Sequence, residues 1–136
     1  MSDENPSMIS HVSVGTNDLD AALEFYDAVL ATLGCKRTLE VPEAGAVAYG
    51  KQFPEFWVQR PHDGAPASLG NGAHVSFLAT SESAVDAFHA AALAAGGTCD
   101  GPPGPRPHYG APYYGCFVRD LDGHKIEAMR WDQTKM

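Results

Sequence analysis

Hydrophobic and polar residues alternate along residues 8–15, with Ile9, His11 and Ser13 on one face and Val12 and Val14 on the other. Alternation with a period of two predicts a β-strand that buries one face. We expect the valine face to pack against a helix and the histidine face to point the other way.

The next segment has apolar residues spaced by three and four, which predicts one buried helical stripe: Leu19, Ala22, Leu23, Tyr26, Val29, Leu30 and Leu33. Asn17 or Asp18 can cap the start of this helix, and Gly34 supplies a glycine stop. Short strands are predicted next at residues 35–41, 46–49 and 53–59, separated by turn-forming segments.

The first strand and its helix recur later in the chain. A shift of 63 positions aligns nine identical residues in 24, beginning with His11-Val12-Ser13 on His74-Val75-Ser76. The second copy predicts a helix that starts at Ser81 or Ser83, a partly extended loop from 98 to 107, and strands at 113–119 and 125–130. The two halves indicate an α+β fold built from two βαβββ units with mixed sheets.

The length of 136 residues predicts a single domain, with module one at about 8–60, a linker at about 61–72 and module two at about 73–130. The net charge of -8 and the lack of a basic stripe argue against a nucleic-acid or anionic-membrane partner. Cys35, Cys99 and Cys116 form no CxxC pair, which predicts a reducing, cytoplasmic location. Polar residues 1–7 predict no signal peptide, and no apolar run approaches the roughly 20 residues of a membrane span.

Three segments together resemble the vicinal oxygen chelate superfamily of glyoxalase I, bleomycin-resistance proteins and extradiol dioxygenases: His11-Val12-Ser13-Val14 with its helix, residues 72–77 and residues 118–127. The resemblance covers about residues 8 to 130. It implies two βαβββ modules that form a U-shaped sheet around a metal site. It specifies the fold and leaves the reaction open, because the family hosts many chemistries.

The resemblance places His11, His74 and Glu127 at the family's metal-ligand positions. Two neutral imidazoles and one carboxylate can hold a divalent ion such as Zn, Ni, Fe, Mn or Co and leave coordination positions open for a substrate. Glyoxalase-I-like members use a further glutamate of the first module as ligand and catalytic base, and Glu55 is the carboxylate available there. Pro54 precedes it and the alignment needs a gap, so Glu55 can instead lie at a strand edge in solvent. Glu55 and Glu127 are therefore the candidate catalytic carboxylates.

Residues 106–114 concentrate one guanidinium, one imidazole and three phenols before a predicted strand. This composition is typical of a substrate-facing wall, and an aromatic loop that packs on the sheet or forms a dimer contact is the alternative. Trp57 can line the opposite wall, although aromatic strand residues more often belong to the core. The candidate substrate-binding residues are Arg106, His108, Tyr109, Tyr113, Tyr114 and Trp57.

Three functions follow from the resemblance. The first is a metal-dependent lyase or isomerase, in which the ion takes two neighbouring oxygens of a small substrate and Glu55 or Glu127 moves a proton. The second is an Fe(II) extradiol-type dioxygenase, and the third is a non-catalytic small-molecule binder like the bleomycin-resistance proteins. The lyase is the leading prediction, and the resemblance also implies a homodimer.

Overall fold

The computed structural model describes residues 5–136, so residues 1–4, which contribute to the signal-peptide prediction, lie outside the described part of the chain. The first module contains β1 (Val12–Gly15), α1 (Leu19–Ala31), β2 (Lys36–Val41), β3 (Ala46–Gly50) and β4 (Phe56–Gln59). The second contains β5 (Val75–Leu78), α2 (Glu82–Ala94), β6 (Thr98–Pro105), β7 (Tyr113–Arg119) and β8 (Lys125–Trp131). Short 3-10 turns lie at Pro42–Ala44, Pro107–Tyr109 and Gln133–Lys135.

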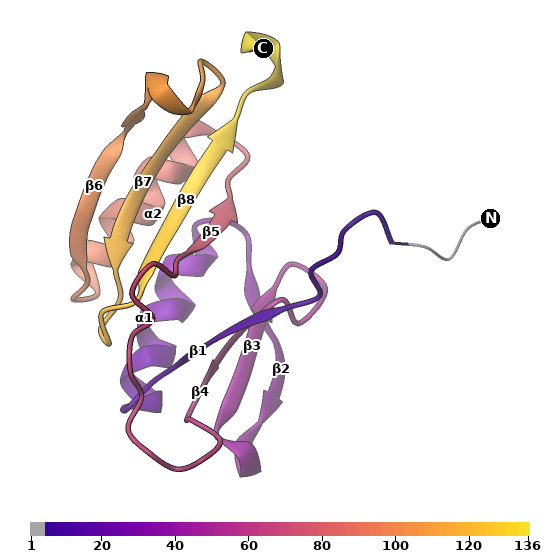
Figure 1. Ribbon diagram of the computed structural model, residues 1–136, viewed down its shortest axis with the longest axis vertical. Helices are drawn as coiled ribbons and strands as arrows, with labels where there is room; N and C mark the ends of the chain where they lie inside the picture. Colours follow the sequence, from indigo (N-terminus) through magenta and orange to yellow (C-terminus); the bar gives the residue numbers. More distant parts are fainter. Residues whose placement is uncertain (1–4) are drawn as a thin grey trace.

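Each module forms its own four-stranded mixed sheet, in the orders β1-β4-β3-β2 and β5-β8-β7-β6 (Figure 1). The β1–β4 and β5–β8 pairs are parallel, and the other neighbouring strands are antiparallel. The same connectivity in both halves confirms the predicted α+β class with two βαβββ modules.

Two strand boundaries differ from the prediction. The first strand begins at Val12, and residues 8–11 form an exposed arm that leads away from the sheet (Figure 1). Residues 98–105 form strand β6, where a loop was expected in part. Proline is tolerated there because β6 is an edge strand with irregular pairing between Cys99 and Gly104, so the missing N–H groups break few ladder bonds.

The core lies between the sheets and the two helices. Asp18 is the cap of α1, where its side chain accepts a hydrogen bond from the Ala21 N–H, and Ser81 caps α2 in the same way. The predicted stripe on α1 is largely buried. Val12 and Val75 pack against the core, and Ile126 and Ala128 are fully buried. The apolar faces of these strands therefore point toward the helices, as predicted.

A polar node joins the turn between β7 and β8 to the first module. Tyr26 on α1 donates a hydrogen bond of 2.5 Å to the buried carboxylate of Asp120. The other oxygen of Asp120 accepts the backbone N–H groups of Asp122 and His124. The His124 ring lies 2.6 Å from the carbonyl oxygen of Gly15. The polar turn thus holds the second module to the start of the first.

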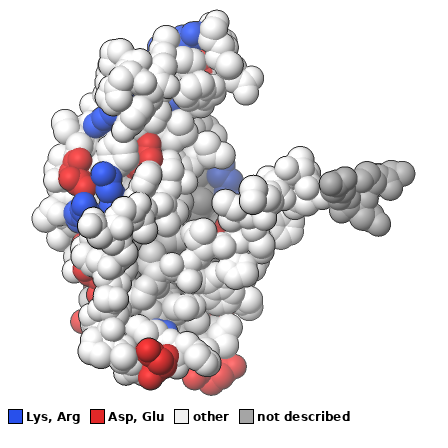
Figure 2. All heavy atoms as spheres, in the orientation of Figure 1, with Lys and Arg blue, Asp and Glu red and all other residues white. Residues whose placement is uncertain are grey.

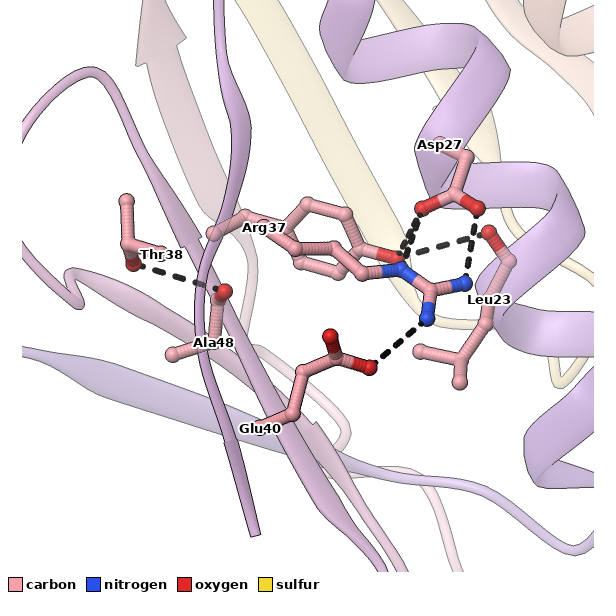
Figure 3. Close-up of polar contacts among 7 residues, drawn as sticks. Leu23, Asp27, Arg37, Thr38, Glu40 and Ala48 are labelled. Carbon is pink, nitrogen blue, oxygen red and sulfur yellow. Dashed lines mark hydrogen bonds and ion pairs between the residues drawn. The ribbon is translucent and has the colours of Figure 1, made fainter. Parts of the chain in front are cut away.

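A second polar cluster fastens the first sheet to its helix. Arg37 on β2 donates two hydrogen bonds to Asp27 on α1, at 2.8 and 2.7 Å, and a third to Glu40 (Figure 3). The hydroxyl of buried Tyr49 donates to the same Asp27 carboxylate at 2.8 Å. The bidentate Arg37 contact lowers the pKa of Asp27, which therefore stays ionised and links β2 and β3 to α1.

Candidate metal centre

The face of the second sheet opposite α2, here called the open face, carries the pair His74 and Glu127. His74 Nε2 lies 3.2 Å from Glu127 Oε1, and the Glu127 side chain is 8% exposed. Glu127 lies on β8, where it pairs with Ser76 of the parallel strand β5, and His74 lies just before β5. The parallel pairing therefore joins an imidazole and a carboxylate that are 53 residues apart in the sequence.

Tyr113 holds the second oxygen of Glu127. Its hydroxyl donates a hydrogen bond of 2.5 Å to Glu127 Oε2. Burial, the hydrogen bond and the negative charge of Glu127 raise the pKa of Tyr113, so the phenol remains protonated and continues to donate. With one oxygen held by Tyr113 and the other beside His74, the carboxylate has a fixed orientation.

Gly115 makes this contact possible. Tyr113 pairs with Trp131, whereas Phe117 pairs with Glu127, so the Tyr113 side chain must lie along β7 to reach Glu127. A Cβ atom at Gly115 would overlap the Tyr113 hydroxyl. A glycine is therefore required at this position of the strand for the phenol to reach the carboxylate.

Phe117 lies beside the pair and is flanked by two cations. Its ring meets the His74 ring edge-on at a centroid distance of 6.1 Å. The Arg106 guanidinium carbon lies 5.2 Å and the Lys125 ammonium 4.8 Å from the centroid of the same ring. Cations over an aromatic face are attracted by the ring quadrupole, so the open face combines the two predicted ligands, His74 and Glu127, with positive charge.

Arg106 is largely engaged by the backbone. It donates to the carbonyl oxygens of Gly115 at 2.6 Å, Pro102 at 2.9 Å and Gly104 at 3.2 Å. These bonds span β6 and β7, so Arg106 fastens the irregular edge strand to its neighbour. The sequence predicts Arg106 as a substrate-binding residue, but these backbone bonds leave fewer of its N–H donors free to contact a substrate.

The aromatic residues of the same segment separate onto different surfaces. Tyr109 is half exposed and meets the Tyr113 ring at 4.9 Å, and exposed His108 lies 4.2 Å from the Tyr109 ring. These two rings extend the open face beyond Tyr113. Tyr114 points the opposite way and donates a 2.7 Å hydrogen bond to Asp86 on α2. Tyr114 is thus on the helix side of the sheet, apart from Glu127.

His11 and Glu55 directly precede the paired strands β1 and β4 of the first module, whereas His74 and Glu127 belong to the second module. The N–H of Val12, next to His11, donates to the carbonyl oxygen of Glu55, and both side chains are exposed. Within residues 5–136, no three His, Cys, Asp or Glu side chains are close enough to hold a metal ion. The predicted ligands of one chain therefore form two separate parts of a ligand set, one on each module.

The strand register shows which residue of module one corresponds to Glu127. The 63-residue shift relates Ser13 to Ser76. Ser76 pairs with Glu127, whereas Ser13 pairs with Trp57. Trp57 therefore occupies the position equivalent to Glu127, and Glu55 lies two residues earlier, just before strand β4.

A groove of about 700 Å³ lies between the modules. Residues of the exposed arm, β1, β4 and β5 line it, including both Glu55 and His74. The apolar side chains Phe56 and Phe77 also line it and contact each other at a ring distance of 5.0 Å. Glu55 thus faces a space that is shared with one of the predicted ligands.

Gly115, Phe117 and Lys125 are further parts of the open face that the sequence does not predict. The period of two in the last strand could have identified Lys125, because it shares a face with Glu127 two residues later. The roles of Gly115 and Phe117 depend on cross-strand register, for which the sequence contains no direct signal.

Neither helix within residues 5–136 is long and apolar enough to cross a membrane.

Comparisons with known proteins identify the family. Residues 8–128 match the model of the glyoxalase/bleomycin resistance protein/dioxygenase superfamily. A glyoxalase/bleomycin resistance protein from Albidiferax ferrireducens T118 is 43% identical, with a TM-score of 0.80 over 90% of this chain and 98% of that one. A lactoylglutathione lyase from Agrobacterium tumefaciens is 23% identical, with a TM-score of 0.62 over 93% of this chain and 95% of that one.

A variant of glyoxalase I from Zea mays is 21% identical, with a TM-score of 0.65 over 97% of this chain and 48% of that one. These last two similarities, below 25% identity, support the fold alone. No functionally curated protein matches the chain. The match to the family model and the similarity to the Albidiferax protein show that this chain belongs to the glyoxalase/bleomycin resistance protein/dioxygenase superfamily.

Proposed function

We propose that the protein is a divalent-metal-dependent lyase or isomerase that binds a small substrate through two neighbouring oxygens. The observation that supports this most strongly is the Glu127 carboxylate, which is buried beside His74 and oriented by Tyr113. Burying a carboxylate costs free energy unless cations or hydrogen bonds compensate it. A hydrogen bond to the oxygen that does not face the imidazole is typical of carboxylates that bind a metal.

The donor types of His11, His74 and Glu127 suit a divalent ion such as Zn, Ni, Fe, Mn or Co. His74 and Glu127 would provide one imidazole and one carboxylate, and His11 would provide the second imidazole. When bound, the ion would act as a Lewis acid toward the substrate oxygens. Glu127 would keep its orientation through Tyr113, and Phe117 would limit access of water to the His74 ring.

We propose that His11 reaches this site from a second copy of the chain. Within one chain, His11 lies on the first module and His74 with Glu127 on the second, and they do not form a three-residue set within residues 5–136. Apolar side chains near these strands are unusually exposed: Met8 at 95%, Leu78 at 74% and Ile9 at 68%. A homodimer that covers them would bury apolar surface and bring complementary half-sites together.

Glu55 is the candidate base of the lyase reaction. It is exposed and belongs to the same module as His11, so the copy of the chain that supplies His11 would also bring its Glu55 to the site. Its carboxylate would move the proton between adjacent carbons of the bound substrate. The reaction therefore places the ligand Glu127 and the base Glu55 on different modules.

An Fe(II) extradiol-type dioxygenase is the second candidate, and the position of Trp57 favours it. The first module has a tryptophan where the second has Glu127, which leaves two histidines and one carboxylate as the ligand set. That set is typical of non-heme Fe(II) oxygenases with open coordination positions.

The free thiols Cys35, Cys99 and Cys116 support the proposed cytoplasmic location.

Two assays separate these reactions. The protein is loaded with Ni or Zn and given the hemithioacetal of methylglyoxal and glutathione, or loaded with Fe(II) and given catechols while oxygen uptake is recorded. Turnover in the first assay that is lost in Glu55→Gln, with metal retained, supports the lyase. Oxygen uptake in the second assay supports the dioxygenase. Metal-independent ligand binding without turnover in either assay contradicts both enzymatic functions and favours a small-molecule binding protein.

A further inference from the structure

We propose that Lys125 makes the open face selective for substrates that carry an anionic group, a carboxylate in particular, next to their metal-binding oxygens. This inference rests on the proposed function and specifies the substrate class of the same site. It concerns a residue that the ligand set does not include.

The strand geometry places Lys125 beside the candidate metal centre. Lys125 lies two residues before Glu127 on β8, so the two side chains share the open face. Val75 pairs with Ile126, which puts Lys125 next to His74 across the parallel strands. The Lys125 ammonium lies over Phe117, the ring that also contacts His74. A substrate held at His74 and Glu127 would therefore extend past the ammonium group.

The charge of Lys125 is only weakly compensated. Within residues 5–136, the acidic oxygen that approaches its ammonium is Asp100 Oδ2, at 3.9 Å. The same oxygen is bound more closely by Arg119, at 3.0 Å. Lys125 is 34% exposed in its side chain, so it remains accessible to a ligand and is partly removed from bulk water.

The surroundings concentrate positive charge on an otherwise acidic protein. Arg106, Arg119 and Lys125 lie near Asp100 and Glu127, which leaves a net positive charge in a chain of net charge -8. Figure 2 shows Lys and Arg side chains on the face formed by β6, β7 and β8, interspersed with acidic side chains. Arg106 is engaged by three carbonyl oxygens and Arg119 by Asp100, so Lys125 is the cation of this cluster with most capacity for a new partner.

The chemistry of lysine suits this role. Its ammonium is a compact charge on a flexible stem with three donors, and it can follow a carboxylate over a range of positions. An anionic group on the substrate would also be attracted by the local positive potential before binding. A neutral group at the same position would leave the ammonium partly desolvated without a partner.

The test compares two ligands with the same vicinal hydroxyls, 3,4-dihydroxybenzoate and 4-methylcatechol, which differ in a carboxylate and a methyl group. The full chain is loaded with redox-inactive Zn²⁺ and each affinity is measured by calorimetric titration. The wild type is expected to bind the carboxylate ligand about fivefold more tightly, as for a partly exposed charge pair. Lys125→Met keeps an unbranched side chain over Phe117 and is expected to remove this preference without weakening the binding of 4-methylcatechol.

Lys36→Met is the matched control, because Lys36 is an exposed lysine on β2 of the other sheet and should leave both affinities unchanged. The role of Lys125 would be overturned if the wild type bound the two ligands with equal affinity, or if the preference survived in Lys125→Met. In either case, Zn²⁺-dependent binding of 4-methylcatechol would still support the metal centre. If neither ligand shows Zn²⁺-dependent binding, the metal centre and the inference fail together.

Discussion

The phenol of Tyr113 and the carboxylate of Glu127 are joined across β7 and β8 by a hydrogen bond of 2.5 Å, although the two residues are not paired in the strand register. This contact fixes the carboxylate on which the proposed metal centre depends. Tyr113→Phe removes the donor and keeps the ring. Because such orienting bonds to metal ligands contribute strongly, we expect the affinity for Zn²⁺ or Ni²⁺ to fall by about tenfold or more.

The measurement for Tyr113→Phe is metal titration, with circular dichroism to verify the fold. Tyr109→Phe is the control, because Tyr109 contacts the Tyr113 ring without bonding to Glu127. Unchanged metal affinity in Tyr113→Phe would show that the hydrogen bond does not orient a ligand.

Gly115→Ala tests the steric requirement of the same contact. The added Cβ would overlap the Tyr113 hydroxyl and approach the Ala128 carbonyl oxygen at 3.0 Å. We expect a loss of about 1–3 kcal/mol in the free energy of unfolding, as for other overpacked sites, together with weaker metal binding. Gly104→Ala on β6 is the matched control, because a Cβ there has no heavy atom within 4 Å. Equal unfolding midpoints in urea for the two variants would contradict the proposed overlap.

Tyr26→Phe tests the node between the modules. The variant leaves Asp120 Oδ2 buried without its phenol donor, which is expected to cost about 1–3 kcal/mol of the free energy of unfolding. Tyr114→Phe removes a hydrogen bond to exposed Asp86 and should cost less. Chemical denaturation of both variants is the measurement, and a larger loss in Tyr114→Phe would argue against the importance of the node.

The Asp27 cluster predicts a pH-dependent contribution to stability. Hydrogen bonds from Arg37 lower the folded-state pKa of Asp27, so its contribution is present above the ordinary aspartate pKa and is lost as the pH falls through the lowered value. Asp27→Asn should therefore be less stable than the wild type at pH 7. Because both side chains are partly exposed, the difference is expected to be modest, about 1 kcal/mol or less.

Urea unfolding at pH 7 and pH 2.5 measures this difference. The difference between wild type and Asp27→Asn is expected to shrink at pH 2.5. A difference that stays constant or grows in acid would show that Asp27 ionisation does not contribute to stability.

Much of the fold could be predicted because the relevant signals are local. The alternation around Val12 and the spacing from Leu19 to Leu33 identify a strand and a helix, and the repeat at His74 identifies the second module. Strand β6 was missed because its prolines indicate a loop, and only its edge position makes them compatible with a sheet.

The candidate site could be predicted in part. Its histidines and glutamate are marked by the repeat and the closing hairpin, and His74 and Glu127 do meet. The equivalence of Trp57 with Glu127 depends on strand register, which the sequence does not encode locally. The separation of His11 from Glu127 within one chain depends on how the modules pack.

The proposed metal centre requires both His74 and Glu127. The most direct test is elemental mass spectrometry of the protein purified without added metal or chelator, beside His74→Ala and the exposed control His108→Ala. We expect about one Fe, Ni, Zn, Co or Mn ion per chain in the wild type and His108→Ala, and its loss in His74→Ala. An absence of bound metal in the wild type, also after these ions are added, or full retention in His74→Ala, would contradict the claim.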